Sequence, residues 1–348
     1  MSLIKPQAAI RPLVEVRDLE VNFVSREANV KAVNGVSFDV SPGEVLCIIG
    51  ESGSGKSVTM RSLMSLHPKK RTRMSGHIRV GDHQVLEMSD RELNAFRGST
   101  VSMIFQEPMT ALDPVYTIGD QIAETVIRHE GLSRKAAMAR ALELLELVKV
   151  PSPERRLRAF PHELSGGLRQ RAMMAVALSC RPKLLLADEP TTALDATVQI
   201  QVLILLRSMQ REFGMGVIFV THDLGVAAQI ADKVAVMYAG RIIEYGGVRD
   251  VLMNPSHPYT RGMLSSNVHG QMRGKDLEAI PGSPPDLRAL PPGCSFTPRC
   301  KFAAPECSAA FPAPKIGRDG HMARCIKAGE LPPFAHAPSA PDRMSAGR

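Results

Sequence analysis

A glycine-rich segment in the first sixth of the chain limits its fold more than any other feature. Residues 50–57 read GESGSGKS, which matches the pattern G-x-x-x-x-G-K-[ST] at every fixed position. The apolar run 45–49 before it has the length of a strand, and residues 58–66 after it lack Pro and Gly and suit a helix. This order of strand, glycine-rich loop and helix is the context that a phosphate-binding loop requires. The segment therefore predicts a nucleotide site.

The residue types of the loop supply the chemistry of such a site. Glycines let the backbone approach phosphate oxygens closely, and the N–H groups at a helix start attract the anion. We expect Lys56 to reach the β and γ phosphates and Ser57 to hold Mg²⁺. The expected nucleotide-binding residues here are Gly50, Ser52, Gly53, Ser54, Gly55, Lys56, Ser57 and Val58.

Strands and helices alternate through the rest of the first 222 residues. Short apolar and polar runs in residues 13–40 predict antiparallel strands with turns at 26–29 and at Asn34-Gly35. Strands that alternate with helices around a phosphate loop predict an α/β fold with a largely parallel sheet core. The sequence places further strands at 76–82, 100–105, 183–189 and 217–221, and helices at 89–97, 118–148, 164–178 and 196–212.

Four polar residues follow or end predicted strands. Asp188 ends an apolar strand, where a buried carboxylate needs a partner such as Mg²⁺. Glu189 follows and is placed to polarise water as a general base, while Gln106 would contact metal and water and His222 the γ phosphate. Open α/β sheets bind ligands at the carboxyl ends of strands. We therefore predict Glu189, His222 and Gln106 as catalytic residues, and Ser57, Gln106 and Asp188 as magnesium ligands.

Two further features admit more than one interpretation. Ser165-Gly166-Gly167 stands at a predicted helix start and forms either a second anion site or an ordinary helix cap. A complete phosphate loop together with a second phosphate-sensing helix tip suggests a dimer whose subunits close each other's sites. Phe23, on a strand upstream of the loop, either stacks on adenine or is a core or edge aromatic.

Charge and apolar content restrict the location and partners. No apolar run reaches the roughly 18 residues of a membrane span, and the segment MSLIKPQAAIRPL lacks a signal-peptide apolar region. We therefore expect a cytoplasmic chain with at most peripheral membrane contact. The net charge of +8 is compatible with nucleic acid, anionic lipid or nucleotide partners, or with a solvated surface.

The C-terminal part differs in composition. Residues 281–348 contain 13 of the 26 prolines, so little regular structure is expected there. Cys294, Cys300, Cys307 and Cys325 have the spacing C-x₅-C-x₆-C-x₁₇-C, unlike the CxxC pairs of common zinc ribbons. In a cytosolic chain such clustering indicates a metal more than disulfides. Four thiolates can hold a [4Fe–4S] cluster, and zinc or no metal are the alternatives. Cys47 and Cys180, in apolar runs, are expected to be inert core residues.

Taken in order, these segments resemble the ATP-binding-cassette (ABC) ATPases. They match Walker A at 50–57, the Q-loop at Gln106, the signature LSGGLRQR at 164–171, Walker B at 184–189, the D-loop TALD at 192–195 and the switch histidine at His222. The resemblance covers about 12–258 and implies an antiparallel β subdomain and a helical insertion at about 107–165. It implies that Phe23 stacks on adenine and that Ser165, Gly166 and Gly167 act on a partner's ATP. Leu168 departs from the commoner LSGGQ, beyond the residues that face phosphate.

Three longer segments resemble the ATPases of bacterial dipeptide and oligopeptide importers, a group that includes nickel and glutathione importers. They are residues 104–124, HPYTRGML at 257–264, and IPGSPPDLRALPPGCSFTPRC at 280–300, which with GKSVT resemble the "D" type of subunit. This resemblance implies a C-terminal region at 259–330 that contains the four cysteines. In some such ATPases this region holds an iron–sulfur cluster. Residues 331–348 are expected to be a disordered tail.

The resemblance also implies function and partners. It predicts an ATP-hydrolysing subunit that powers peptide uptake, with ATP and Mg²⁺ as cofactors. The partners would be two transmembrane permeases, a second and different ABC ATPase, and an extracytoplasmic solute-binding protein, with no nucleic acid. The expected location is peripheral, on the cytoplasmic face of the bacterial inner membrane. Alternatives are nickel or glutathione import, a soluble non-transport ABC ATPase, and a regulatory ATPase whose tail senses iron or redox state.

Overall fold

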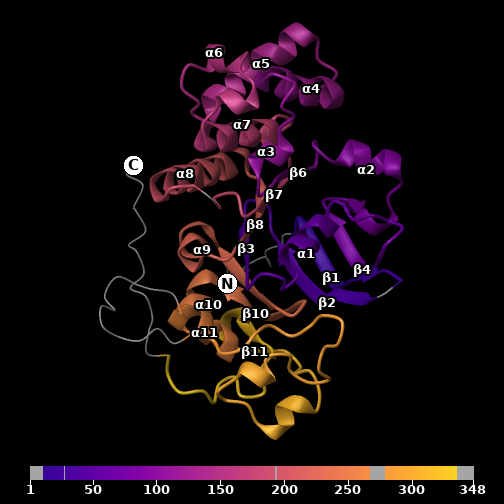
Figure 1. Cartoon of the computed structure of the whole chain (residues 1–348), viewed down its shortest axis with the longest axis vertical. Helices are drawn as coiled ribbons and strands as arrows, with labels where there is room; N and C mark the ends of the chain where they lie inside the picture. The colour runs from indigo at the N-terminus through magenta and orange to yellow at the C-terminus, as the bar shows by residue number, and fades with distance from the viewer. Residues whose placement is uncertain (1–10, 27, 193, 267–278, 335–348) are drawn as a thin grey trace, which may run out of the picture.

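The computed structural model describes residues 11–26, 28–192, 194–266 and 279–334 and contains two β-sheets (Figure 1). The larger sheet has the strand order β11-β12-β10-β9-β3-β8-β7-β6. Its β9, β3, β8, β7 and β6 are parallel, and β10, β12 and β11 continue it with antiparallel pairing. The α/β fold with a mixed sheet is confirmed. The strand bounds are β3 (Val45–Ile49), β6 (Val101–Ile104), β7 (Leu184–Asp188), β8 (Gly216–Thr221), β9 (Lys233–Tyr238), β10 (Arg241–Gly247), β11 (Lys315–Ile316) and β12 (Met322–Ala323).

The smaller sheet is antiparallel, as the alternating pattern near the N-terminus predicted. Its order is β2-β1-β4-β5, with bounds β1 (Val14–Val24), β2 (Asn29–Val40), β4 (Thr72–Val80) and β5 (His83–Gln84). The predicted turn at Asn34-Gly35 is wrong, because both residues lie inside β2. Gly35 has φ 70°, and the register with β1 shifts beside it. The Asn-Gly pair therefore forms a bulge rather than a turn.

Helices cover the larger sheet and build a separate lobe (Figure 1). The lobe consists of α3 to α7 and lies above β6, the edge strand of the larger sheet, in this view. Among the described helices, none has both the length and the apolar character to cross a bilayer. The helix bounds are α1 (Lys56–Ser62), α2 (Asp90–Phe96), α3 (Pro108–Ala111), α4 (Ile118–Glu130), α5 (Arg134–Leu147), α6 (Pro153–Leu157), α7 (Gly166–Leu178), α8 (Ala196–Phe213), α9 (Leu224–Ile230), α10 (Val248–Met253) and α11 (Pro258–Ser266).

Two helix starts, that of the helix predicted at 89–97 and that of α5, are fixed by serine caps. Ser89 accepts a hydrogen bond from the N–H of Glu92, whose carboxylate accepts one from the N–H of Ser89, a complete capping box at α2. Ser133 caps α5 by accepting from the N–H of Ala136. These caps satisfy N–H groups that have no acceptor within the helix.

The core lies on both faces of the larger sheet. Along β3 the side chains alternate: Val45, Cys47 and Ile49 face one hydrophobic cluster with the helices, and Leu46 and Ile48 face another with the smaller sheet. All five are fully buried. Burial raises the pKa of the Cys47 thiol, which keeps it in its unreactive protonated form. The phosphate loop thus begins at the end of a strand fixed from both sides.

Residues 279–334, the C-terminal extension, form turns and very short elements packed on this core. They include the 3-10 turns η3 (Thr297–Arg299), η4 (Pro305–Ser308) and η5 (Arg318–Gly320). Pairing of β12 with β10 joins the extension to the edge of the larger sheet. Of the predicted disordered tail, residues 331–334 lie against α11, where Arg261 Nη1 donates to Pro332 O at 2.6 Å. Residues 335–348 are outside the described part.

A buried carboxylate fastens the extension to the sheet. Glu244 on β10 is fully buried and accepts hydrogen bonds from the N–H groups of Ser256 (2.6 Å) and His257 (3.0 Å). It also accepts from His321 Nε2 of the extension at 2.8 Å. This hydrogen bond, opposed by burial, raises the pKa of His321 above its ordinary value.

This histidine makes stability depend on pH. Because the folded protein holds the proton of His321 more tightly than the unfolded chain, its contribution is fully present below the unfolded pKa of about 6.5 and is lost as pH rises through the folded pKa. We expect the free energy of unfolding to fall over that window more in the wild type than in His321→Gln. Urea unfolding of both proteins between pH 6 and pH 9 measures the difference, and parallel pH profiles would contradict it.

Candidate active site

The phosphate loop connects β3 to α1 and touches two other strands. Gly50 has φ 152°, and a Cβ atom there would lie 2.2 Å from the carbonyl oxygen of Met237 on β9. Gly55 has φ 100°, and a Cβ atom there would lie 2.5 Å from the carbonyl oxygen of Ala32 on β2. A side chain at either position would collide with backbone, so the loop requires glycine at both.

Lys56 is held across the loop. Its side chain is buried, and Nζ donates to the carbonyl oxygens of Gly50 (2.7 Å) and Glu51 (2.9 Å). Burial lowers the pKa of Lys56, although the carboxylates of Glu189 and Asp188 oppose that shift. The backbone N–H groups at the start of α1 have no acceptors within the helix. The ammonium and these N–H groups together form a cradle suited to a polyphosphate.

A serine–carboxylate pair stands beside this cradle. Ser57 Oγ donates to Asp188 Oδ1 at 2.8 Å, and Arg61 Nη2 lies 3.4 Å from Asp188 Oδ2. Asp188 is only 1 % exposed, and burial raises the pKa of its carboxyl group. A carboxylate this buried is stabilised by a cation. The oxygen donors of Ser57 and Asp188 therefore fit Mg²⁺, which prefers such ligands.

Three polar side chains converge on one oxygen of Glu189, the residue after β7. Glu189 Oε2 accepts from Gln106 Nε2 (3.4 Å), His222 Nδ1 (3.1 Å) and Thr192 Oγ1 (3.0 Å). A carboxylate only accepts, so His222 carries its proton on Nδ1. The structure thus brings together Gln106, Glu189 and His222, as predicted from strand ends. Thr192 was missed, because only its place in the TALD segment pointed to it.

Phe23 lies on β1 and contacts His67, which follows α1 in the chain. Its half-buried ring meets the His67 ring edge to face, with centroids 5.5 Å apart. His67 Nε2 lies within hydrogen-bonding distance of Ser62 Oγ (3.1 Å) and Val58 O (3.0 Å) on α1. The sequence analysis did not single out His67, since an isolated histidine carries no pattern. This arrangement places Phe23 beside the helix that follows the phosphate loop.

Ser165, Gly166 and Gly167 form an exposed helix tip outside this cluster. Ser165 is the residue before α7, and its exposed side chain makes no cap hydrogen bond. A Cβ atom on Gly166 would meet nothing within 4 Å, whereas one on Gly167 would lie 2.9 Å from Val198 Cγ1. In Figure 1, α7 belongs to the helical lobe and α1 lies beside the smaller sheet. The structure therefore does not join this tip to the chain's own phosphate loop.

A groove separates the helical lobe from the α1–α2 region. It encloses about 440 Å³, and its lining includes Leu66, Arg97, Phe105 and Arg128. The segment after Gln106 also exposes Met109, Val115 and Tyr116, with Val115 71 % exposed. Such a concentration of exposed apolar side chains marks an interaction surface.

The four cysteines of the extension surround one small cavity. Cys294, Cys300, Cys307 and Cys325 all line it, together with His257, and its volume is about 20 Å³. Cys294 N donates to Cys307 O at 2.8 Å, which holds two of the turns together. In the described part of the chain, no three His, Cys, Asp or Glu side chains are placed to hold a single metal ion. The cysteines are thus brought together, but not in the tight tetrahedron that zinc requires.

Comparisons with known proteins agree with this geometry. Residues 33–192 match the family described as ABC transporter, and residues 243–307 match the C-terminal region of oligopeptide/dipeptide transporters. The dipeptide transport ATP-binding protein DppD of Bacillus subtilis is 46% identical over 90% of this chain and 94% of its own length. The oligopeptide transport ATP-binding protein OppD of Salmonella typhimurium is 47% identical over 92% of this chain and 95% of its own length.

Solved structures show the same cassette. The ATP-binding cassette MJ0796, in a dimeric post-hydrolysis state bound to ADP and Pi, matches with a TM-score of 0.61 at 28% identity. The match covers 68% of this chain and 99% of that one. It therefore spans a complete cassette, and about a third of this chain lies beyond it.

Proposed function

Because the chain belongs to the ABC transporter family and has the C-terminal region of oligopeptide/dipeptide transporters, we propose the following roles for its residues as the ATP-hydrolysing subunit of a peptide importer. The observation that carries this function is the convergence of Gln106, Thr192 and His222 on Glu189. In the same site, Ser57 and Asp188 are paired beside the phosphate loop. This arrangement suits water attack on a bound polyphosphate.

Each residue of the site has a proposed task. Lys56 and the loop amides bind the phosphates, and Phe23 stacks on adenine. Ser57, Asp188 and Gln106 hold Mg²⁺, which neutralises charge on the phosphates when it is bound. Glu189 takes a proton from the attacking water, while His222 and Gln106 fix its carboxylate. His222 also contacts the γ phosphate.

The exposed helix tip implies a second ATPase. Gly166 faces open space and the Ser165 hydroxyl makes no cap hydrogen bond, which supports a role of this tip toward the nucleotide of another subunit. Solved relatives of the cassette include dimers, which supports the same arrangement. We propose that this subunit is a second, homologous ABC ATPase and that the pair is a heterodimer.

The groove beside the helical lobe is the proposed docking site for a membrane partner. Phe105 lines this groove directly before the active-site residue Gln106, and the segment that follows exposes Met109 and Val115. We propose that one of two transmembrane permease subunits docks there, gripped by the insertion at about 107–165. The chain would then lie peripherally at the cytoplasmic face of the inner membrane. An extracytoplasmic solute-binding protein would deliver the cargo.

Peptides are the proposed cargo, in preference to nickel or glutathione, because the relatives described above are named for dipeptide and oligopeptide transport. The test is reconstitution of the chain with both permeases, the second ATPase and the binding protein in liposomes. We expect ATP-dependent uptake of a labelled dipeptide or oligopeptide. Uptake of nickel or glutathione alone would contradict the proposal that peptides are the cargo. Absence of ATP hydrolysis would contradict the proposed ATPase function.

We also propose that the cysteine cavity holds a [4Fe–4S] cluster, with zinc as the alternative. All four thiols line the cavity, on turns and loops that can widen around a larger group. A tetrahedral zinc ion needs four sulfurs at about 2.3 Å. A cluster instead takes one thiolate at each iron, so its thiolates stand farther apart. The gathering of four thiols around one cavity is what supports a four-thiolate cluster here.

Anaerobic purification tests the cluster. We expect a brown protein with about four irons and four sulfides per chain. A Cys300→Ser variant should lose most of the iron, whereas Cys180→Ser, outside the cavity, should keep it. A colourless protein with one zinc would establish the alternative, and a protein with neither metal would refute both.

A further inference from the structure

The C-terminal extension reaches into the phosphate loop through Glu51, the residue after Gly50. Arg299 Nη1 lies 2.8 Å from Glu51 Oε2, and Arg299 Nη2 lies 3.1 Å from Glu51 Oε1. The guanidinium therefore binds the carboxylate with both ends of its fork, although the residues are 248 positions apart. Bidentate pairs of this kind combine charge neutralisation with fixed geometry.

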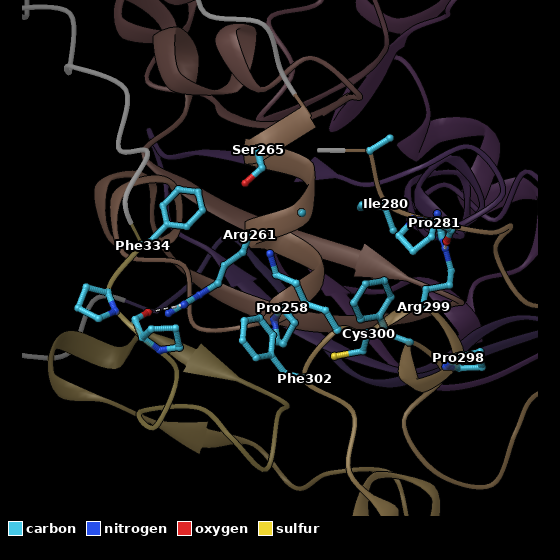
Figure 2. Close-up of a pocket in the computed structure, with 16 residues that line it drawn as sticks. Pro258, Arg261, Ser265, Ile280, Pro281, Pro298, Arg299, Cys300, Phe302 and Phe334 are labelled. Carbon is cyan, nitrogen blue, oxygen red and sulfur yellow. Dashed lines mark hydrogen bonds between the residues drawn. The ribbon is translucent and has the colours of Figure 1, made fainter. Parts of the chain in front are cut away.

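Arg299 is itself held firmly. Its side chain is only 6 % exposed, and Nε donates to Pro281 O at 2.8 Å, a contact seen in Figure 2 where Arg299 stands beside Pro281 at one side of the pocket. Nη1 also lies 3.3 Å from Tyr238 Oη. The guanidinium is near the rings of Tyr238 and Phe296, at 5.9 and 6.0 Å. The orientation of the Arg299 guanidinium is therefore fixed before any nucleotide binds.

A second contact holds the backbone of the same residue. The N–H of Glu51 donates to Tyr259 Oη at 2.9 Å, and Tyr259 on α11 is fully buried. Tyr259 packs against Tyr238 and Phe296, with ring centroids 4.6 and 5.4 Å away. The side chain and the backbone of Glu51 are thus both fixed by residues after the cassette's last strand.

The charge of Glu51 makes this contact matter for nucleotide binding. A carboxylate in the phosphate loop repels the anion that the loop must accept, unless a cation neutralises it. The carbonyl of Glu51 also accepts a hydrogen bond from Lys56 Nζ, so a shift of Glu51 would move the ammonium. Arg299 therefore reduces the repulsion, because it neutralises the carboxylate of Glu51. It also keeps the position of Lys56, because it holds Glu51 toward the extension.

We propose that Arg299 is a positioning residue of the nucleotide site, which through Glu51 holds the phosphate loop ready for ATP. The inference rests on the proposed ATPase function and extends it: the extension is part of what makes the loop bind tightly. Arg299 directly precedes Cys300, so whatever fixes the cysteine cavity also fixes Arg299. Arg299 touches no reacting atom, and its effect should appear in affinity rather than in the chemical step.

The test measures ATP dissociation constants by calorimetry and turnover of the full chain at saturating Mg·ATP. Removal of one partner of a buried charge pair is costly, so Arg299→Met should weaken ATP binding about tenfold or more. The maximal turnover should change by less than about threefold, because the reacting groups are intact. The double variant Glu51→Gln/Arg299→Met removes both charges and should bind within about threefold of the wild type.

Two further variants complete the test. Arg288→Met removes an exposed arginine of the extension that pairs only with Asp286 in the contacts described, and should leave ATP affinity unchanged. Arg299→Lys keeps the charge but loses the fork, so it should fold and bind ATP about threefold more weakly. Wild-type affinity in both Arg299→Met and Arg299→Lys would overturn the proposal, as would a double variant no better than Arg299→Met. If the wild type binds ATP but does not hydrolyse it, the ATPase function fails instead.

Discussion

Glu189→Gln should lower ATP turnover by about 100-fold or more while ATP binding is retained. The amide keeps the shape of the carboxylate, but it cannot take a proton from the attacking water, and a general base contributes about 10²–10⁴-fold to rate. The phosphate loop and the Ser57–Asp188 pair are untouched by this change. Phosphate release by the assembled complex at saturating Mg·ATP, with ATP affinity measured alongside, checks both parts.

The matched control for this variant is Glu212→Gln. Glu212 is an exposed glutamate near the end of α8, away from the residues that contact Glu189. Its variant should keep wild-type turnover. If Glu189→Gln instead hydrolysed ATP within about threefold of the wild-type rate, another group would be the base, and the convergence on Glu189 would have a structural role only.

The sequence predicted the parts of the site that depend on local order along the chain. The loop between β3 and α1 is a continuous sequence motif, so the strand before it and the helix after it could be predicted together with it. Gln106, Asp188 and His222 each stand at the end of a parallel strand, and such ends meet at one edge of a sheet. Their meeting could therefore be predicted without knowing how any side chain packs.

Contacts between distant segments could not be predicted in this way. The pairs Arg299–Glu51 and Glu244–His321 join an irregular extension to the cassette, and no periodicity marks them. At Asn34-Gly35 the local sequence predicted a feature that does not form. The two residues suit a tight turn, but β2 pairs with β1 on both sides of them, so they form a bulge. In each case the long-range partner, which the local sequence does not contain, decides the outcome.

The second large effect is expected at Glu244. Replacement by alanine leaves the N–H groups of Ser256 and His257 and the His321 ring without their acceptor, a carboxylate that has no exposure to water. Breaking a buried pair in this way costs about 3–5 kcal/mol. Because these contacts join the extension to β10, the C-terminal extension should detach at lower urea concentration than the cassette unfolds.

Far-UV circular dichroism and amide hydrogen exchange can follow this loss, since the chain contains no Trp to report it. Exchange in Glu244→Ala should rise first in β12 and in the segment before α11, where the acceptor is lost. Glu20→Ala removes an exposed glutamate on β1 and should change the free energy of unfolding by no more than about 0.5 kcal/mol. Equal stability of Glu244→Ala and Glu20→Ala would mean that aromatic packing around Tyr259 and Phe296, rather than the buried carboxylate, fastens the extension. In that case the Arg299–Glu51 contact would survive the loss of Glu244, whereas detachment of the extension should also weaken ATP binding.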